Sequence, residues 1–322
     1  MPHSKHANIS IFVPHIGCPH RCSFCDQRTI SGAQHAPTGD EVREICRRAL
    51  TEVKSPENTE IAFFGGSFTA IPGAYMTELL TAAHEFIGEG RFRGIRISTR
   101  PDCITPEILT ELKNAGVTAI ELGAQSMSDR VLELNERGHT AEDVRRASAL
   151  IRGFGFELGL QMMMGLYGSG KTDELTTTEQ IAAIKPDTVR IYPVVILKNT
   201  RLGELYRSGE YTTFAFGEVV DMASAAMAEF EYSGIRVIKC GLHASEFVER
   251  DMIGGFYHPA FRELCEGLIY RKNMEQLMTG GAKEYRFAVH PTCISKALSH
   301  GKSNAAYFAE KGIAIKVTGD EN

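Results

Sequence analysis

Three cysteines with the spacing C-x3-C-x2-C stand out in the segment GCPHRCSFC: Cys18, Cys22 and Cys25. Thiolates this close together are ligands for zinc or for an iron–sulfur cluster. A structural zinc ion takes four ligands, usually from two C-x-x-C pairs or from added histidines. No second such pair exists here, so a zinc site would need His15, His20 or a distant cysteine. Three thiolates instead suit a [4Fe–4S] cluster that keeps one iron open for a further ligand.

A second stretch, GLYGSGKT at residues 165–172, matches the phosphate-binding pattern G-x-x-x-x-G-K-[ST]. A nucleotide hydrolase also needs an acidic residue for magnesium at the end of another strand, and no strand-like run clearly offers one. The stretch follows the fifth expected strand rather than the first. We therefore interpret it as a turn before a helix, where Lys171 could contact an anionic group of the substrate. A nucleotide-binding protein and a zinc- or RNA-binding module remain the alternatives from other classes of protein.

The composition is that of a folded protein without a membrane span. The chain has 322 residues, 43% of them hydrophobic, which is enough for a large core. Its formal charge is −5 and its acids and bases are interspersed, so no single basic surface indicates a nucleic-acid partner. No run of about 18 apolar residues suggests a membrane helix, and the start, MPHSKHANIS, lacks the apolar core of a signal peptide. We expect a cytoplasmic protein that does not bind membranes.

From residue 8 onward, short β-type runs alternate with amphipathic helical segments. The expected strands are NISIFVPH, TEIAFFGG, RGIRIST, TAIELGAQ, FELGLQMMM and DTVRIYPVVI. The expected helices are TGDEVREICRRALTEV, capped by Thr38 or Asp40, residues 74–87, TPEILTELKNAG, a segment ending near 153, residues 173–184, and helices between 201 and 232. About six strand–helix units indicate an α/β protein with a parallel sheet, either an open doubly wound sheet or a curved partial barrel. In both, functional side chains gather on the loops at the carboxyl ends of the strands.

Beyond GIRVIKCGL the pattern changes. HPAFRELCEGLIYRKNMEQLM indicates one long helix, and the remainder indicates a strand, helices and a last strand. We therefore expect a first domain over residues 1–244 and a small C-terminal α+β extension, or cap, over residues 245–322. Lys296, Lys302 and Lys311 lie amid aromatic residues in this cap; they could line a nucleic-acid groove or belong to a solvated surface, since acids balance them.

The cluster motif CPHRCSFC, directly after the first strand, resembles that of the radical S-adenosylmethionine (SAM) superfamily, whose fold is a partial (β/α)6 parallel barrel. Phe24 takes the place of the aromatic residue that commonly precedes the third cysteine in that superfamily. The resemblance implies that Cys18, Cys22 and Cys25 bind three irons of a [4Fe–4S] cluster, while the open iron chelates SAM. Reductive cleavage of SAM would then give methionine and a 5′-deoxyadenosyl radical that abstracts hydrogen from the substrate.

Residues 9–235 also resemble the radical domain of the Elongator catalytic subunit, which modifies wobble uridine in tRNA. The likeness rests on AFFGGSFTAIP, STRPD, IELGAQSMSDRVLELNERGHTAEDV, LGLQMMMGLYG and VRIYPVVILKNTRL. It implies a set of SAM contacts: Gly65, Gly66 and Ser67 at the methionine amine, Gln125 and Arg137 at the ribose and carboxylate, Gln161 at the ribose, and Tyr192 and Pro193 beside the adenine.

The chain departs from the Elongator pattern at several places. Ser98 stands where that pattern has a glutamate before T-R-P-D, a position that the resemblance assigns to SAM binding, and Tyr167 replaces a proline in the Gly-Leu-Pro-Gly turn. Glu121, on the next strand, could face either way. We expect no acetyltransferase domain like that of the subunit within residues 245–322, which are too few for one, so we do not carry over its complete reaction.

Together these residues predict a cytoplasmic radical SAM enzyme that needs a low-potential electron donor, such as a ferredoxin or flavodoxin. An RNA nucleobase, in tRNA for instance, is the leading expectation for the substrate; a small metabolite or a peptide is the alternative within the same chemistry. His243 and His258 are candidates for proton transfer with the substrate, and Lys198 and Arg201 for contact with an anionic substrate. The sequence does not determine the substrate or the oligomeric state.

Overall fold

The computed structural model describes residues 7–13, 16, 18, 21–26, 29–30, 32, 35–243 and 245–320. The three cluster cysteines are among them. His15 and His20, the histidines that a zinc site would need, lie outside the described residues.

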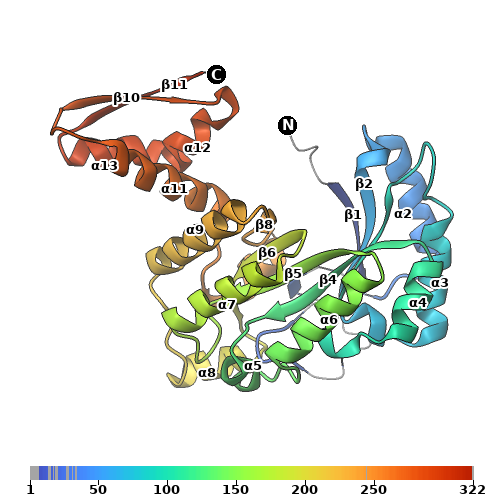
Figure 1. Ribbon diagram of the computed structural model, residues 1–322. Helices are drawn as coiled ribbons and strands as arrows, with labels where there is room; N and C mark the ends of the chain where they lie inside the picture. The colour runs from blue at the N-terminus through green and yellow to red at the C-terminus, as the bar shows by residue number, and fades with distance from the viewer. Residues whose placement is uncertain are drawn as a thin grey trace.

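A curved sheet of seven parallel strands forms the centre of the molecule (Figure 1). In spatial and chain order the strands are β1 (Ala7–Val13), β2 (Thr59–Gly65), β3 (Gly94–Thr99), β4 (Val117–Gln125), β5 (Glu157–Met164), β6 (Thr188–Pro193) and β8 (Arg236–Cys240). The prediction of an α/β partial barrel with parallel strands is therefore confirmed. The seventh strand, β8, lies in GIRVIKCGL, the run that precedes the change of pattern, and it was not among the predicted strands.

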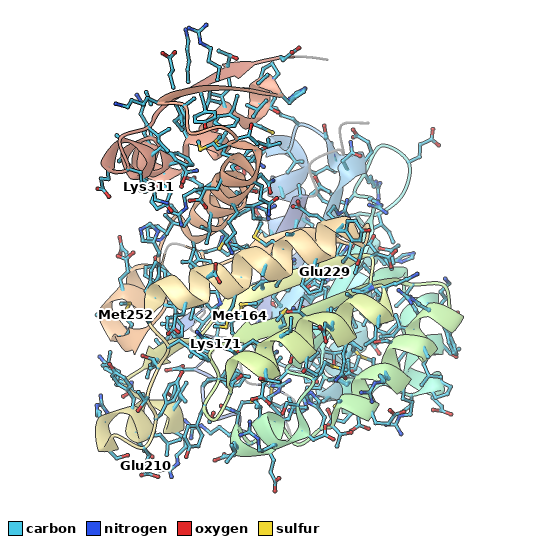
Figure 2. All side chains as sticks on the ribbon, turned by 60° about the vertical axis from the view of Figure 1, so that its left-hand side comes forward. Met164, Lys171, Glu210, Glu229, Met252 and Lys311 are labelled. Carbon is cyan, nitrogen blue, oxygen red and sulfur yellow. The ribbon has the colours of Figure 1, made fainter. Side chains whose placement is uncertain are left out.

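Helices cover the outer face of this sheet (Figure 1). The longer ones are α2 (Gly39–Glu52), α3 (Gly73–His84), α4 (Pro106–Asn114), α6 (Ala141–Gly153), α7 (Lys171–Ile184) and α9 (Phe216–Tyr232); α5 (Asp129–Leu134), α8 (Arg201–Ser208) and α10 (Glu246–Asp251) are short. Of the two predicted caps of α2, Thr38 is the one used. Its hydroxyl accepts from the amide of Glu41, and the Glu41 carboxylate accepts from the amide of Thr38. Figure 2 shows α9, labelled at Glu229, beside α7, whose first residue is Lys171.

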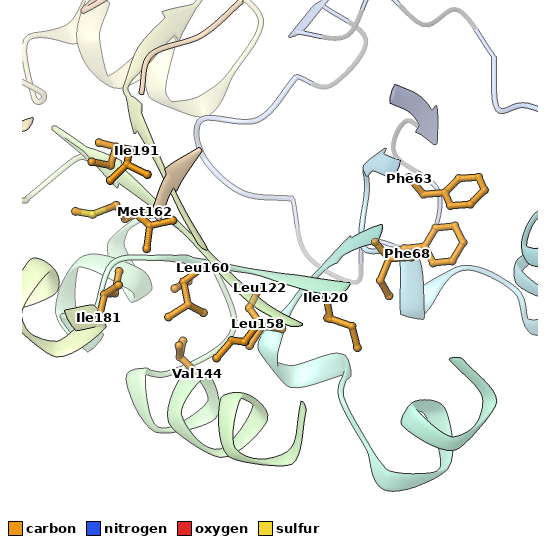
Figure 3. Close-up of a cluster of buried hydrophobic side chains, with 14 of the residues drawn as sticks. Phe63, Phe68, Ile120, Leu122, Val144, Leu158, Leu160, Met162, Ile181 and Ile191 are labelled. Carbon is orange, nitrogen blue, oxygen red and sulfur yellow. The ribbon is translucent and has the colours of Figure 1, made fainter. Parts of the chain in front are cut away.

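The main core lies between the sheet and these helices. Along β4 and β5, Ile120, Leu122, Leu158 and Leu160 point toward Val144 of α6 and Ile181 of α7 (Figure 3). Because side chains alternate along a strand, the residues between them, such as Glu121 and Gly123, point to the opposite, concave face. That face is where the sequence places most of the candidate functional residues.

The loops at the carboxyl ends of the strands hold small additional elements. Strand β7 (Val195–Leu197) follows β6 after one residue and pairs antiparallel with β9 (Met252–Gly255). Single 3-10 turns cover Pro56–Asn58, Phe68–Ala70, Pro101–Cys103, Pro291–Cys293 and His300–Lys302. The run DTVRIYPVVI, predicted as one strand, is thus divided into β6 and β7, because Pro193 and Val194 turn the chain away from the sheet.

The C-terminal part consists of α11 (Phe261–Leu277), β10 (Glu284–Val289), α12 (Ile294–Leu298), α13 (Ser303–Glu310) and β11 (Ala314–Gly319). It has a small core of its own around Met274, Ala297 and Phe308, whereas Phe261 and Cys265 of α11 belong to the main core. Helix α11 is thus shared by both cores, and the domain boundary at residue 245 stays a prediction. Within the described ranges, no helix is both long and apolar enough to cross a bilayer.

Candidate cofactor and active site

A cavity of about 1050 Å³ opens on the concave face of the sheet. Every residue that the sequence assigns to the cluster or to SAM lines it: Cys18, Cys22, Phe24, Cys25, Gly65, Gly66, Ser67, Ser98, Gln125, Arg137, Gln161, Tyr192 and Pro193. They come from seven loops or strands that are separated in the sequence. The parallel sheet brings them together because the carboxyl ends of all its strands meet at one edge.

The cysteine loop is fixed to the barrel through Ser23. The Ser23 amide and hydroxyl donate to the backbone oxygen (3.1 Å) and side-chain oxygen (2.9 Å) of Asn135, and the Ser23 carbonyl accepts from the amide of Leu202 at 2.7 Å. Cys25 donates its amide to the carbonyl of Cys22 at 3.1 Å, which closes a tight turn. This anchoring holds the second and third thiols at the wall of the cavity.

The thiols of Cys18 and Cys25 lie in a partly buried environment that favours their protonated form when no metal is bound. Burial, with added repulsion from the neighbouring thiols, raises the pKa of Cys25 to about 12, and burial also raises the pKa of Cys18. Iron can replace the proton of such a buried thiol, because metal ligation stabilises the thiolate. The Arg137 guanidinium donates to the sulfur of Cys22 at 2.9 Å. Hydrogen bonds to the sulfurs are one of the features by which a protein adjusts the reduction potential of an iron–sulfur cluster.

No three His, Cys, Asp or Glu side chains of the described residues converge on a single metal ion, the three cysteines included. A [4Fe–4S] cluster requires a different arrangement, in which each thiolate bonds to a different iron at the corners of a cube. The donor set, three thiols around an open cavity, therefore fits the cluster.

The turn after β2 brings the backbone close to the cysteine loop. Gly65 has a φ of +113°, and a Cβ there would come within 2.9 Å of the carbonyl oxygen of Val13. At Gly66 a Cβ would lie 2.8 Å from the carbonyl oxygen of Ile16 and 3.6 Å from the sulfur of Cys18. Only glycine fits at these two positions. Backbone groups of the turn therefore face the cavity beside the first cysteine, with no side chain in the way.

Two buried polar atoms of the cavity wall have no hydrogen-bond partner among the described residues: Oε1 of Gln125, at the end of β4, and Nε of Arg137, in the loop after α5. Gln125 has a φ of 64°, which strains a non-glycine residue and aims its side chain away from the strand direction. The other nitrogens of Arg137 bond to Cys22 and, at 2.7 Å, to the carbonyl of Gly123. One acceptor and one cationic donor thus remain for a polar ligand with an anionic group.

Charged residues that the sequence analysis did not single out lie deeper in the barrel. Arg190 binds both carboxylate oxygens of Glu121, at 2.7 and 3.0 Å. Arg96, which is fully buried, contacts Glu60 at 2.7 Å, Glu121 at 3.3 Å and Glu157 at 2.5 Å. Burial alone would raise the pKa of Glu121, but Arg190 and Arg96 outweigh it and hold the pKa below its usual value.

This network also settles the direction of Glu121, which the sequence left open, since the carboxylate faces inward. The side-chain nitrogen of Gln161 donates to Glu121 at 2.8 Å and to the hydroxyl of Ser98 at 3.2 Å. Ser98, at the place of the Elongator glutamate, is thus tied to Gln161 and through it to Glu121. The alternation in IRI, where Arg96 stands between the buried Ile95 and Ile97, was the available signal that an arginine points into the barrel.

The end of the cavity at β8 is basic. Nζ of Lys239 lies 3.2 Å from Nδ1 of His243, and both residues line the cavity with Arg190. Burial, together with the nearby Arg190 cation, lowers the pKa of Lys239; burial and Lys239 lower the pKa of His243. Of the two predicted histidines, His243 thus reaches the cavity. His258 does not line it; its Nδ1 accepts from the amide of Ala260 at 3.0 Å.

The other predicted basic contacts are engaged elsewhere. Lys198 pairs with Asp251 at 2.8 Å, and Arg201 pairs with Glu204 at 3.0 Å. Lys171 pairs with Glu218 of α9 at 2.7 Å and lies on the outside of the barrel, between α7 and α9 (Figure 2). The structure therefore does not bring Lys171 to the cavity, and its expected contact with an anionic substrate group has no geometric support.

Comparison with known families gives two matches along the chain. The Radical SAM superfamily matches residues 12–179, and the Radical_SAM C-terminal domain matches residues 186–271. Among curated proteins, an uncharacterized protein of Methanocaldococcus jannaschii is 28% identical over 219 residues, which cover 64% of this chain and 67% of that protein.

Two named relatives match shorter segments. The tRNA uridine(34) acetyltransferase of M. jannaschii is 32% identical over 141 residues, and human Elongator complex protein 3 is 26% identical over 194 residues. These segments cover 43% and 54% of this chain. They span only 26% and 36% of the length of the respective relatives.

Solved structures show the same fold at low identity. The Elp3 protein of Methanocaldococcus infernus matches with a TM-score of 0.68 at 20% identity, over 84% of this chain and 64% of that one. Methylornithine synthase matches with a TM-score of 0.52 at 13% identity, over 86% and 84%. Because the superfamily match covers more than half of its residues, the chain belongs to the Radical SAM superfamily and is an enzyme whose cofactors are a [4Fe–4S] cluster and SAM.

Proposed function

We propose that this radical SAM enzyme acts on a nucleobase of RNA, and that Cys18, Cys22 and Cys25 hold its cluster. The observation that carries the cluster assignment is the arrangement of the three thiols around one cavity, with Arg137 bonded to the sulfur of Cys22 at 2.9 Å. When bound, the cluster and SAM together supply the 5′-deoxyadenosyl radical that abstracts hydrogen from the substrate. The residues of this chain bind, orient and shield the reactants.

Assignment of the SAM contacts follows the polar groups of the cavity wall. Backbone groups of Gly65 and Gly66 beside Cys18 would receive the methionine amine, since no side chain blocks them. Arg137 Nε would bind the carboxylate and Gln125 Oε1 would accept from a ribose hydroxyl; both atoms lack a partner among the described residues. These groups complement the charge and polarity of SAM.

The remaining contacts concern the nucleoside part of SAM. Gln161, held by Glu121 and next to Ser98, would meet the ribose. The backbone of Tyr192 and Pro193 would lie beside the adenine, and Ser67 and Phe24 would lie near the methionine and the cluster. A radical reaction requires that water and stray side chains be kept away from the reacting carbon, and the curved sheet supplies that enclosure.

The identity of the substrate is supported by two observations. Relatives of this chain include a tRNA uridine(34) acetyltransferase, whose name describes an enzyme that acts on tRNA. In addition, the β8 end of the cavity carries Lys239, His243 and Arg190. Such a group would bind an anion, for instance a phosphate next to the target base. We also infer a low-potential electron donor, such as a ferredoxin or flavodoxin, and a cytoplasmic location, since the cluster needs an electron and reducing, oxygen-poor surroundings.

The test is anaerobic reconstitution with iron and sulfide, followed by reduction in the presence of SAM and of total tRNA labelled with deuterium in the nucleobases. The expected result is a brown chromophore, release of 5′-deoxyadenosine, and deuterium in that product. Cys18→Ala, Cys22→Ala and Cys25→Ala should each abolish all three, whereas Cys46→Ala, a buried cysteine outside the cavity, should not. Deoxyadenosine without deuterium from any RNA would reject the RNA substrate and favour a small metabolite or a peptide.

A further inference from the structure

The C-terminal unit, residues 283–320, has the order strand, helix, helix, strand. Its strands β10 and β11 pair in parallel, from Glu284 with Ala314 to Val289 with Gly319. One face of this small sheet packs on the helices through Phe287, Ile315 and Val317. The other face is exposed along its whole length, as the alternating burial of both strands shows, and Figure 1 shows the helices on one side only.

The tight loop between α12 and α13 comprises Ser299, His300, Gly301 and Lys302. Three of its residues have a positive φ: 64° at Ser299, 59° at Gly301 and 58° at Lys302. A serine and a lysine in this conformation are strained, so the surrounding structure must hold them. Ser299 packs directly on Gly267 of α11. A Cβ at position 267 would lie 2.0 Å from the hydroxyl oxygen of Ser299, so this close contact requires glycine.

A buried asparagine fixes the helix that follows the loop. The side-chain nitrogen of Asn304 donates to the carbonyl of Gly267 at 2.7 Å and to the carbonyl of Ala297 at 2.9 Å. It thereby ties α13 to both α11 and α12. The loop is thus held against α11, with His300, Gly301 and Lys302 exposed to solvent.

The charge of this unit is opposite to that of the whole chain. Residues 283–320 contain six lysines and arginines and three acidic residues, while the chain has five more acids than bases. Lys296 and Lys311 pair with acids of α11. Lys283, Lys302 and Lys316 are exposed and make no ion pair within the described part of the chain. Three unpaired cations on a small unit favour a polyanionic partner.

We propose that residues 283–320 form a module that binds single-stranded RNA, with the loop 299–302 against the sugar–phosphate backbone. RNA-binding modules of the KH class hold about four nucleotides with a G-x-x-G loop, whose glycine-like backbone admits close approach of phosphates. Here Ser299, Gly301 and Lys302 adopt that glycine-like backbone, and His300 and Lys302 add positive or donor groups. The excess of basic residues agrees with such a module, because a basic patch is the electrostatic signature of proteins that bind nucleic acids.

A series of contacts through α11 connects the module to the cavity. His300 lies 3.3 Å from a carboxylate oxygen of Glu263 in the first turn of α11. Phe261, two residues earlier, packs against Gly241, where a Cβ would lie 2.8 Å from Phe261. The next residue, Leu242, lines the cavity together with His243. RNA held at the loop would therefore lie near the β8 edge of the barrel; this part of the inference rests on the proposed RNA substrate.

The test measures binding of a fluorescein-labelled single-stranded RNA oligonucleotide to the full chain without cluster or SAM, by anisotropy at several salt concentrations. Lys302→Glu should weaken binding about tenfold and lower the slope of log affinity against log salt by roughly 0.7, the share of one phosphate contact. Lys283→Glu should weaken it as well. Lys54→Glu, the same charge change at an exposed lysine that follows α2, is the matched control and should change affinity less than twofold.

Lys302→Gly keeps the positive φ without strain and removes the charge, so a loss of binding there cannot come from misfolding of the loop. Equal effects of Lys302→Glu and Lys54→Glu, no binding by the parent chain, or equal affinity for duplex RNA would overturn the proposal. Release of 5′-deoxyadenosine by Lys302→Glu without RNA should equal that of the parent. Failure of the radical reaction on RNA would leave these binding results unchanged, so the two proposals can fail separately.

Discussion

At the scale of single residues, Arg137 joins the two halves of the candidate site. One of its nitrogens donates to the sulfur of Cys22, another to the carbonyl of Gly123, and Nε remains for a ligand. A charged hydrogen bond in a buried site contributes about 1.5 to 3 kcal/mol. Loss of the guanidinium should therefore weaken SAM binding more than any loss of surface charge.

We expect Arg137→Met to raise the dissociation constant for SAM about tenfold or more, since 1.4 kcal/mol corresponds to a factor of ten. Equilibrium dialysis with the reconstituted, oxidised protein measures this without turnover. Arg145→Met, an exposed arginine of α6 bonded to Glu142, is the control and should leave the constant unchanged. An unchanged affinity in Arg137→Met would remove this residue from the SAM site.

The buried pair of Arg190 and Glu121 gives a second prediction at this scale. Arg190→Met would remove two hydrogen bonds from the carboxylate of Glu121, which is 1% exposed. The carboxylate would keep its contacts with Arg96 and Gln161. Breaking such a pair costs about 3 to 5 kcal/mol. The double variant Arg190→Met, Glu121→Gln should lose less than the sum of the single losses, because the uncompensated charge is gone. Additive losses in urea unfolding would show that the two groups are not coupled.

How far the sequence predicts the site depends on the kind of residue. That the cysteines, Gly65 and Gly66 lie at one cavity could be predicted from the cysteine spacing and the family resemblance. The partners of Arg96, Arg190 and Lys239 could not be predicted, because alternation along a strand indicates which face a residue lies on but not which side chains from other strands lie next to it. For Lys171 the sequence predicted a contact that the structure does not support. The pattern around it matches a phosphate-binding loop and suggested an anionic substrate group as its partner, but its side chain pairs with Glu218 of α9.

At the scale of elements, the turn that carries this pattern is held by a buried carboxylate. Glu174, in the first turn of α7, accepts from the amide of Gly165 and from the hydroxyl of Ser169, both at 2.8 Å. Burial raises its pKa from its usual 4.5 to about 7 despite these bonds. The folded chain therefore holds this proton more tightly than the unfolded chain. The associated stability is complete below about pH 4.5 and is lost as the pH rises through 7.

We expect Glu174→Gln to be as stable as the parent or less stable at pH 5, and more stable than the parent at pH 8. The difference in free energy of unfolding between variant and parent should change by at most roughly 3 kcal/mol between these pH values. Gln keeps an acceptor oxygen for both bonds and cannot ionise. Chemical unfolding at both pH values measures the effect, with Glu179→Gln, exposed on the same helix, as the control. A difference that does not vary with pH would mean that Glu174 is not protonated in the folded chain.

The length of a helix or strand decides whether it could be predicted from the sequence. Long amphipathic helices and apolar strands were located because periodicity over ten or more residues is a strong signal. The predicted helix 173–184 is α7, which begins two residues earlier at Lys171. The short elements β9 and α10 were not predicted, and β7 was not separated from β6, because three to six residues carry too little periodicity. The pairing of β7 with β9 also depends on contacts between residues 55 to 60 positions apart.

At the scale of the whole molecule, α11 is the element on which two cores depend. Its first residues, Phe261 and Cys265, belong to the main core, and Met274 near its end belongs to the small core with Ala297 and Phe308. The small core has few buried side chains, so removing one of them should unfold the C-terminal unit before the barrel. A change at the start of α11 should affect both parts.

Phe308→Ala should cost about 3 to 5 kcal/mol in the small core, since it deletes a buried phenyl ring. We expect calorimetry to show an early transition for the C-terminal unit, limited proteolysis to cut after α11, and the reconstituted barrel to go on releasing 5′-deoxyadenosine. Phe261→Ala, of the same size, should lower the main transition and that release together. A single shifted transition in Phe308→Ala, with parallel loss of SAM cleavage, would show instead that the barrel and the C-terminal unit fold as one cooperative body.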